Sequence, residues 1–177
     1  MKVEAVLVDR DGTLVGNVPY LADPAGLHLL PGVIEGLARL DRTGVPRAVV
    51  TNQAGLARGL VRVEQLLDVN AALRSMVAPI GLGPILWCPH HPDFTGPCRC
   101  RKPAPGLLLD ALALLGVDPA ASVMIGDRPT DAAAALAIGM TAVVVGDAGG
   151  DELPAGTLSV DTFDAAVEMV IGWAAEP

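Results

Sequence analysis

Short apolar runs alternate along this chain with segments whose apolar residues recur at helical spacing. The runs, which are rich in β-branched residues, predict buried strands at 3–8, 46–50, 84–87, 122–125 and 141–145. The intervening segments predict helices at 32–40, 63–77, 105–115 and 130–138, and a further helix follows Asp161. Strand–helix alternation is typical of βαβ units, which build a central parallel sheet with helices on both faces. We therefore expect a fold of the α/β class.

Length and charge narrow the possible functions. A chain of 177 residues, 51% of them hydrophobic, predicts a single domain over residues 1–177. A net charge of −8 argues against binding to nucleic acid or to anionic membranes. Charges at Lys2, Glu4 and Asp9 leave no room for a signal peptide. We therefore expect a cytoplasmic protein. We also expect a monomer, because no heptad pattern or long exposed apolar helix is evident.

Four of the predicted strands run directly into polar residues. These are Asp9-Arg-Asp11, Thr51-Asn-Gln53, Cys88-Pro-His90 and Gly126-Asp-Arg128. Ligands of parallel sheets bind outside the carboxyl ends of the strands. The four segments should therefore meet along one edge of the sheet.

Asp9 and Asp11 would place two carboxylates close together at the end of a buried strand. Their repulsion favours a hard cation between them, and Mg²⁺ is the natural choice for oxygen ligands. A solvated turn is the alternative, because Asp11-Gly12 is a pair that favours turns. The two residues alone leave both interpretations open.

All three cysteines of the chain lie within thirteen positions, beside a histidine. Cys88-x-His90 and Cys98-x-Cys100 supply four ligands in two close pairs. This set suits a tetrahedral zinc ion with no open position, and hence a structural one. Three cysteines are too few for two disulfides, while incidental buried cysteines remain the alternative. A zinc ion here would fix a short loop and so position the Arg101-Lys102 pair that follows it.

The segment Asp9-Arg-Asp-Gly-Thr13 resembles the DxDGT motif of the haloacid dehalogenase superfamily. Thr51, Lys102 and Gly126-Asp-Arg-Pro-Thr-Asp131 follow in the order of that superfamily's other motifs, so that the resemblance covers residues 3 to 145. It implies a Rossmann-like haloacid dehalogenase fold. No long insertion follows Thr13 or separates Thr51 from Lys102, which implies that no separate cap domain is present.

The resemblance also implies an enzyme with a two-step mechanism. Asp9 would attack phosphorus, and Asp11 would serve as general acid and then as general base. Thr51 and Lys102 would hold the phosphate. The implied Mg²⁺ ligands are Asp9, Asp127 and the backbone carbonyl of Asp11.

Two neighbouring residues keep more than one interpretation. Asp131 would orient the site or Lys102, or interact with the dipole of its own helix. Arg58 would bind a second phosphate or cap a helix.

The segments Cys88-Pro-His-His-Pro92 and Cys98-Arg-Cys-Arg-Lys-Pro-Ala-Pro-Gly106 resemble those of the D-glycero-D-manno-heptose 1,7-bisphosphate phosphatases. The resemblance implies Mg²⁺-dependent removal of the C7 phosphate of that small phosphorylated sugar. It also implies six substrate contacts, from Asn17, Tyr20, Asn52, Gln53, Arg101 and Arg128.

Two other functions stay open. Seven residues separate His90 from Cys98, a spacing closer to that of the related histidinol-phosphate phosphatases. The third interpretation is a catalytically inert phosphosugar-binding protein with the same fold.

Overall fold

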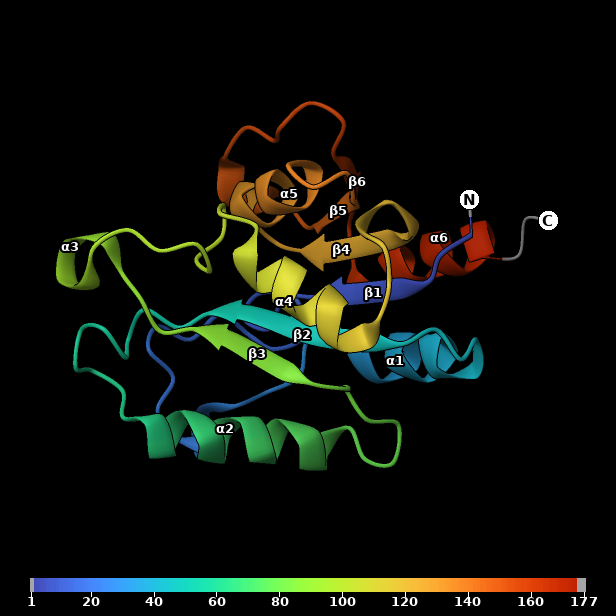
Figure 1. Cartoon of the computed structure of the whole chain (residues 1–177). Helices are drawn as coiled ribbons and strands as arrows, with labels where there is room; N and C mark the ends of the chain where they lie inside the picture. Colours follow the sequence, from blue (N-terminus) through green and yellow to red (C-terminus); the bar gives the residue numbers. More distant parts are fainter. Residues whose placement is uncertain (1, 175–177) are drawn as a thin grey trace.

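The computed structural model describes residues 2–174, and a six-stranded parallel sheet forms their centre (Figure 1). Its strands lie in the order β3-β2-β1-β4-β5-β6. They are β1 (Ala5–Val8), β2 (Arg47–Asn52), β3 (Ile85–Cys88), β4 (Ser122–Gly126), β5 (Thr141–Val145) and β6 (Leu158–Val160). Every neighbouring pair is parallel, as the alternation of strand and helix patterns predicts.

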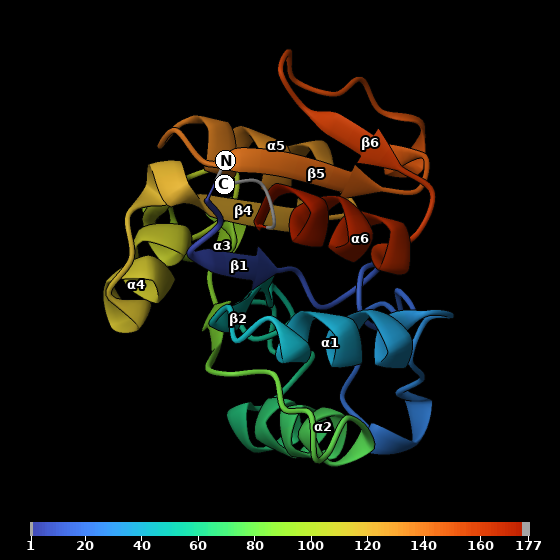
Figure 2. The same ribbon diagram turned by 90° about the vertical axis from the view of Figure 1, so that its right-hand side faces the viewer.

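Helices cover both faces of the sheet (Figure 2). On one face lie α1 (Val33–Arg42), α2 (Val63–Met76) and α6 (Phe163–Ala174), and on the other α4 (Gly106–Leu115) and α5 (Pro129–Leu136). A hydrophobic core lies on each face of the sheet. Side chains of each strand pack alternately into one core and the other, because successive residues of a strand point to opposite faces. In β1, Val6 packs with the first group of helices and Leu7 with the second. The α/β class and the two-sided arrangement are thus confirmed.

The remaining elements are short and were not predicted. They are α3 (Pro92–Thr95), the strand β6 and three 3₁₀ turns, η1 (Pro24–Gly26), η2 (Pro119–Ala121) and η3 (Ala148–Gly150). Elements of three or four residues are too short to show a periodic pattern. Between β2 and β3 the chain forms α2, whose Val69 and Leu73 pack in the core, and no inserted domain lies within residues 2–174. That residues 1–177 form one domain stays a prediction.

The strand order reverses between β1 and β4. Chain connections leave these two neighbours in opposite directions, which opens a crevice beyond their carboxyl ends where ligands of such sheets bind. Val8 and Ile125 are register partners there, so the segments beginning with Asp9 and Gly126 leave the sheet side by side. None of the described helices is both long and apolar enough to cross a bilayer.

Two leucines of α4 test the packing of this helix on the sheet. Leu108 is fully buried, whereas Leu114 on the same helix is 64% exposed. Leu108→Ala should lower the free energy of unfolding by about 2–5 kcal/mol, because it leaves a cavity in the core. Leu114→Ala should change it by roughly 0.5 kcal/mol or less. Equal effects in denaturant titrations would contradict the placement of α4.

Candidate active site

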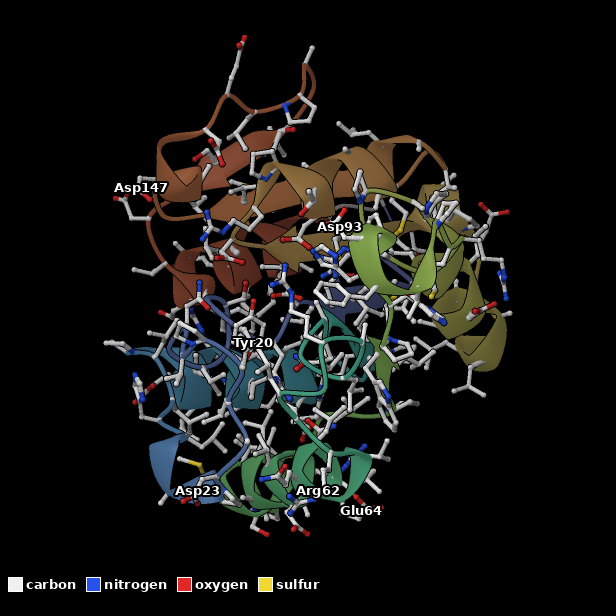
Figure 3. The ribbon with its side chains drawn as sticks, turned by 90° about the vertical axis from the view of Figure 1, so that its left-hand side faces the viewer. Tyr20, Asp23, Arg62, Glu64, Asp93 and Asp147 are labelled. Carbon is white, nitrogen blue, oxygen red and sulfur yellow. The ribbon has the colours of Figure 1, made fainter. Side chains whose placement is uncertain are left out.

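Three of the four polar strand ends, those after β1, β2 and β4, line a pocket of about 320 Å³ at the carboxyl edge of the sheet, and the segment Cys88-Pro-His90 does not line it. Nine of the predicted site residues line it: Asp9, Asp11, Asn17, Thr51, Asn52, Arg101, Lys102, Asp127 and Arg128. The other two predicted contacts with substrate, Tyr20 and Gln53, line an adjoining cavity of about 210 Å³ that also contains Asp11. Figure 3 looks onto this edge, with Tyr20 near its middle and Asp93 of the loop 89–100 above it.

A buried lysine is the electrostatic centre of the pocket. The Nζ atom of Lys102 donates to Asp9 Oδ1 at 2.5 Å and to the carbonyl of Val50 at 2.8 Å, and it pairs with Asp131 Oδ1 at 2.6 Å. Burial alone would lower the pKa of Lys102, but the carboxylates of Asp131 and Asp9 more than reverse this and raise it. The ammonium group is therefore charged, and each of its three donors has an acceptor.

Asp131 fills both of the roles that the sequence left open. Its Oδ1 atom pairs with Lys102, while Oδ2 accepts from the backbone N–H of Arg128 at the start of α5. A Cβ atom at Gly126 would lie 2.4 Å from Oδ2 of Asp131, so a larger residue there would displace this carboxylate. Glycine at the end of β4 thus permits the contact between α5 and the lysine.

Three carboxylates form a group that fits a hard cation. Oxygen atoms of Asp9, Asp127 and Asp131 lie within 4.8 Å of one another. Burial, reinforced by the Asp131 carboxylate, raises the pKa of Asp9 and raises that of Asp127 to about 6. Gly12, with φ of +87°, permits this close grouping, because a Cβ there would lie 2.1 Å from Asp127 Oδ2. Three crowded carboxylates, which the single charge of Lys102 neutralises only in part, fit a Mg²⁺ ion.

The Asp11 carboxylate is held away from this group. Its Oδ2 atom accepts from Gln53 Nε2 at 2.7 Å and from the Thr51 hydroxyl at 3.3 Å. Both of its oxygens also accept from Arg10, at 2.9 to 3.2 Å. The predicted contribution of Asp11 to a metal site through its backbone carbonyl is compatible with this orientation and stays a prediction.

Asn52 is engaged with the backbone of the lysine. Its Nδ2 atom donates to the Lys102 carbonyl at 3.0 Å, and its Oδ1 atom accepts from the Lys102 N–H at 3.1 Å. This pair of bonds fastens the end of β2 to the residue that carries the ammonium group. The predicted contact between Asn52 and substrate stays a prediction.

The four cysteine and histidine ligands predicted from the sequence come together. Cys88 Sγ lies 3.1 Å from Cys100 Sγ and 3.7 Å from both Cys98 Sγ and His90 Nδ1. Zinc–sulfur bonds of about 2.3 Å in a tetrahedron put neighbouring ligand atoms roughly 3.8 Å apart. The four donors therefore fit a structural zinc ion. Arg101 follows directly and donates to the carbonyl of His90 at 3.3 Å.

Arg58 contacts two segments that lie far apart in the sequence. These are the segment 89–100, through His91 and Phe94, and Tyr20, which lines the adjoining cavity. Its Nη2 atom lies 3.0 Å from His91 Nε2, and its guanidinium group lies over the rings of Phe94 and Tyr20, at 5.0 and 5.8 Å from their centroids. Arg58 does not cap α2, because Arg62 occupies the N-cap position of that helix. This contact was not predicted, because it depends on how two loops meet.

Comparison with known proteins places these motifs in a family. Residues 99–164 match the model of the HAD-hydrolase-like family. The chain is 41% identical over 142 residues to the D-glycero-beta-D-manno-heptose-1,7-bisphosphate 7-phosphatase of Yersinia pestis, an alignment covering 76% of each chain. It is 38% identical over 142 residues to the protein of that name from Escherichia coli K12, covering 76% of this chain and 74% of that one.

A solved structure is similar over almost the whole chain. It is the D,D-heptose 1,7-bisphosphate phosphatase of B. bronchiseptica, complexed with magnesium and phosphate. The TM-score is 0.88 at 31% sequence identity, with 98% of this chain and 100% of that one covered.

Adjacent histidines provide a matched test of the zinc site. His90→Ala removes one of four ligands and should lower the zinc content from about one ion per chain to a small fraction of that. His91→Ala should leave the zinc content unchanged. Metal analysis after dialysis measures both, and limited proteolysis within residues 89–100 should accelerate only for His90→Ala. Equal zinc loss in the two variants would contradict the assigned ligands.

The raised carboxyl pKa values predict that Mg²⁺ binding depends on pH. Protons compete with the ion for Asp127 below pH 6, so the Mg²⁺ dissociation constant should rise by at least about tenfold from pH 7 to pH 5. Titration calorimetry in buffers of different ionisation enthalpy should show proton release, and Asp127→Asn should bind Mg²⁺ weakly at both values.

The same shift predicts the direction of the stability change. Since the folded protein binds this proton more tightly than the unfolded chain, the contribution of Asp127 to stability without Mg²⁺ falls as pH rises from 3.8 to about 6. The stabilisation by Mg²⁺ should therefore grow with pH. An affinity for Mg²⁺ that does not change with pH would contradict the assignment of Asp127 as a ligand.

Proposed function

We propose that this chain, which belongs to the family of the D-glycero-beta-D-manno-heptose-1,7-bisphosphate 7-phosphatases, removes the C7 phosphate of D-glycero-β-D-manno-heptose 1,7-bisphosphate. Membership of this family makes it a phosphoric monoester hydrolase with a haloacid dehalogenase fold. The β anomer is proposed because the names of the curated relatives specify it. One observation of this chain carries the proposal: a buried aspartate, Asp9, lies against Lys102 in a pocket that also contains Arg101 and Arg128. These cations would favour an anionic substrate once Mg²⁺ offsets the four aspartates that also line the pocket.

In the proposed reaction, Asp9 attacks the phosphorus atom and an aspartyl-phosphate forms while the bond to the sugar oxygen breaks. Asp11 gives its proton to that oxygen and so releases a neutral alcohol. Asp11 then accepts a proton from the water that attacks the aspartyl-phosphate. Inorganic phosphate leaves, and both aspartates return to their starting states.

The charged and polar groups around Asp9 support phosphate binding. Lys102 and Thr51 line the same pocket as Asp9, and we assign the ammonium group and the hydroxyl to hydrogen bonds with the equatorial oxygens of a phosphate bound to Asp9, which would stabilise the transition state. A Mg²⁺ ion held by Asp9, Asp127 and the backbone carbonyl of Asp11 would reduce the repulsion between the nucleophile and the phosphate. The zinc ion would act only by fixing the loop that carries Arg101 and Lys102.

The remaining substrate contacts are assigned to the rim of the two cavities. Arg101 and Arg128 are our candidates for binding the phosphate that is not cleaved, because both are cations in the pocket. Asn17, Tyr20, Asn52 and Gln53 are proposed to contact the sugar. The proposal retains three expectations from the sequence: a monomer, a cytoplasmic location, and no binding to nucleic acid or membranes.

The test is phosphate release by the purified protein with Mg²⁺ from the two anomers of the heptose bisphosphate and from histidinol phosphate. We expect preference for the β-heptose compound, and a fall of roughly 10⁴-fold or more in kcat for Asp9→Asn, which should still bind substrate. Preference for histidinol phosphate would reject the substrate and keep the chemistry. Tight binding without release by the unaltered protein would favour an inert phosphosugar-binding protein.

A further inference from the structure

Arg10, between the two aspartates Asp9 and Asp11, is an arginine in an unusual position. Its side chain is 1% exposed, although it lies in a loop at the edge of the sheet. Burying a guanidinium group costs several kcal/mol unless charged or polar partners surround it. The partners of Arg10 therefore indicate its role.

The partners of Arg10 lie on two sides of its planar guanidinium group. Nε and Nη2 donate to the two carboxylate oxygens of Asp11, at 2.9 to 3.2 Å. Nη1 donates to Asn70 Oδ1 at 2.8 Å. Asn70 belongs to α2 and is itself 5% exposed. The planar guanidinium group of Arg10 is thus bound to Asn70 of α2 on one side and to the Asp11 carboxylate on the other.

Apart from Arg10, the Asp11 side chain is held only through its Oδ2 atom, which accepts from Gln53 at 2.7 Å and from Thr51 at 3.3 Å, whereas Arg10 holds both oxygens. The side chain of Asp11 is 20% exposed, and the residue precedes Gly12, whose φ of +87° turns the chain. The carboxylate lies at the boundary of the pocket with Asp9 and the adjoining cavity with Tyr20, which is where the oxygen of the departing alcohol would lie. Transfer of a proton to that oxygen requires the carboxyl group to lie within hydrogen-bond distance of it.

We propose that Arg10 is a positioning residue for the general acid and base Asp11, and that Asn70 anchors Arg10 to α2. This inference rests on the proposed function, because it requires Asp11 to transfer protons. Arg10 also lines the adjoining cavity, but in this role it acts through Asp11 and not by contact with substrate or metal. The rival explanation is structural: the Arg10–Asn70 bond would serve only to fasten α2 to the edge of the sheet.

Substrates with different leaving groups separate the two explanations. A sugar or glycerol oxygen is a poor leaving group and needs a proton from Asp11, whereas p-nitrophenolate is a weak base that leaves without one. The ratio kcat/KM covers only the steps up to formation of the aspartyl-phosphate, so the later role of Asp11 as a base does not enter it. A displaced Asp11 should therefore slow the alcohol phosphates and spare p-nitrophenyl phosphate.

The variants are Arg10→Lys, which keeps the charge and loses the planar fork, and Asn70→Leu, which removes the anchoring oxygen. For heptose bisphosphate and glycerol 2-phosphate we expect kcat/KM to fall about 100-fold with Arg10→Lys and about tenfold with Asn70→Leu. For p-nitrophenyl phosphate the fall should be roughly threefold or less. Asn70→Asp, which keeps an oxygen acceptor for Arg10, should restore most of the activity lost in Asn70→Leu.

Arg47→Lys is the matched control for Arg10→Lys. Arg47 is also largely buried, with a side chain 10% exposed, and it bonds to Asp41 and to the carbonyls of Ile80 and Gly81, away from both cavities. Arg47→Lys should leave the ratio between alcohol and p-nitrophenyl substrates unchanged. Unfolding temperatures of all variants separate loss of stability from loss of positioning.

An Asp11→Asn background completes the test. If Arg10 acts through Asp11, adding Arg10→Lys to Asp11→Asn should cause no further loss on alcohol phosphates. The inference is overturned if Arg10→Lys slows all three substrates equally, or if its effect remains in full without Asp11.

Failure of the proposed function would look different. Hydrolysis of glycerol 2-phosphate without hydrolysis of heptose bisphosphate would reject the proposed substrate alone, and the glycerol 2-phosphate ratios would still decide the role of Arg10. Absence of turnover on every substrate would overturn both proposals.

Discussion

The structure of the site depends on one buried ion cluster, in which Lys102 pairs with Asp9 and Asp131. Removing the ammonium group of Lys102 would leave two carboxylates buried without their counter-ion, at a cost of several kcal/mol. The cluster lies beyond β1 and β4, where the reversal of strand order separates the chain connections and leaves room for a ligand. Gly12 and Gly126 complete the arrangement, because a Cβ at either position would collide with a carboxylate of the group.

The loop that carries the four candidate zinc ligands leads to the lysine of this cluster. The chain leaves the sheet at Cys88, passes His90, Cys98 and Cys100, and returns as Arg101 and Lys102. Three hydrogen bonds hold the returning segment. Arg101 donates to the carbonyl of His90, and the Asn52 side chain bonds to both the N–H and the carbonyl of Lys102. A metal ion that appears remote from the chemistry would thus set the position of the ammonium group, which explains why every cysteine of the chain lies in this loop.

The sequence predicted the parts of the molecule that follow from local patterns. Runs of apolar and β-branched residues located β1 to β5, and the polar residues after β1, β2 and β4 located the pocket, because parallel strands share one carboxyl edge. Arg10 was overlooked, because arginine is seldom fully buried and nothing adjacent in the sequence indicates its bond to Asn70, sixty residues away. The two bonds from Asn52 to the backbone of Lys102 were also beyond prediction, since they depend on the orientation of one side chain in the folded protein. For Asp131 the sequence suggested both roles as alternatives, but it did not indicate that one carboxylate fills both.

In the proposed mechanism, Asp9 becomes covalently phosphorylated. The most direct measurement is rapid acid quenching of the protein with Mg²⁺ and its best substrate, followed by mass spectrometry of the peptide that contains Asp9. The account predicts a transient phosphopeptide with the phosphate on Asp9, which hydroxylamine removes because it is an acyl phosphate. Efficient turnover without a phosphorylated peptide, or with the phosphate on another residue, would contradict it.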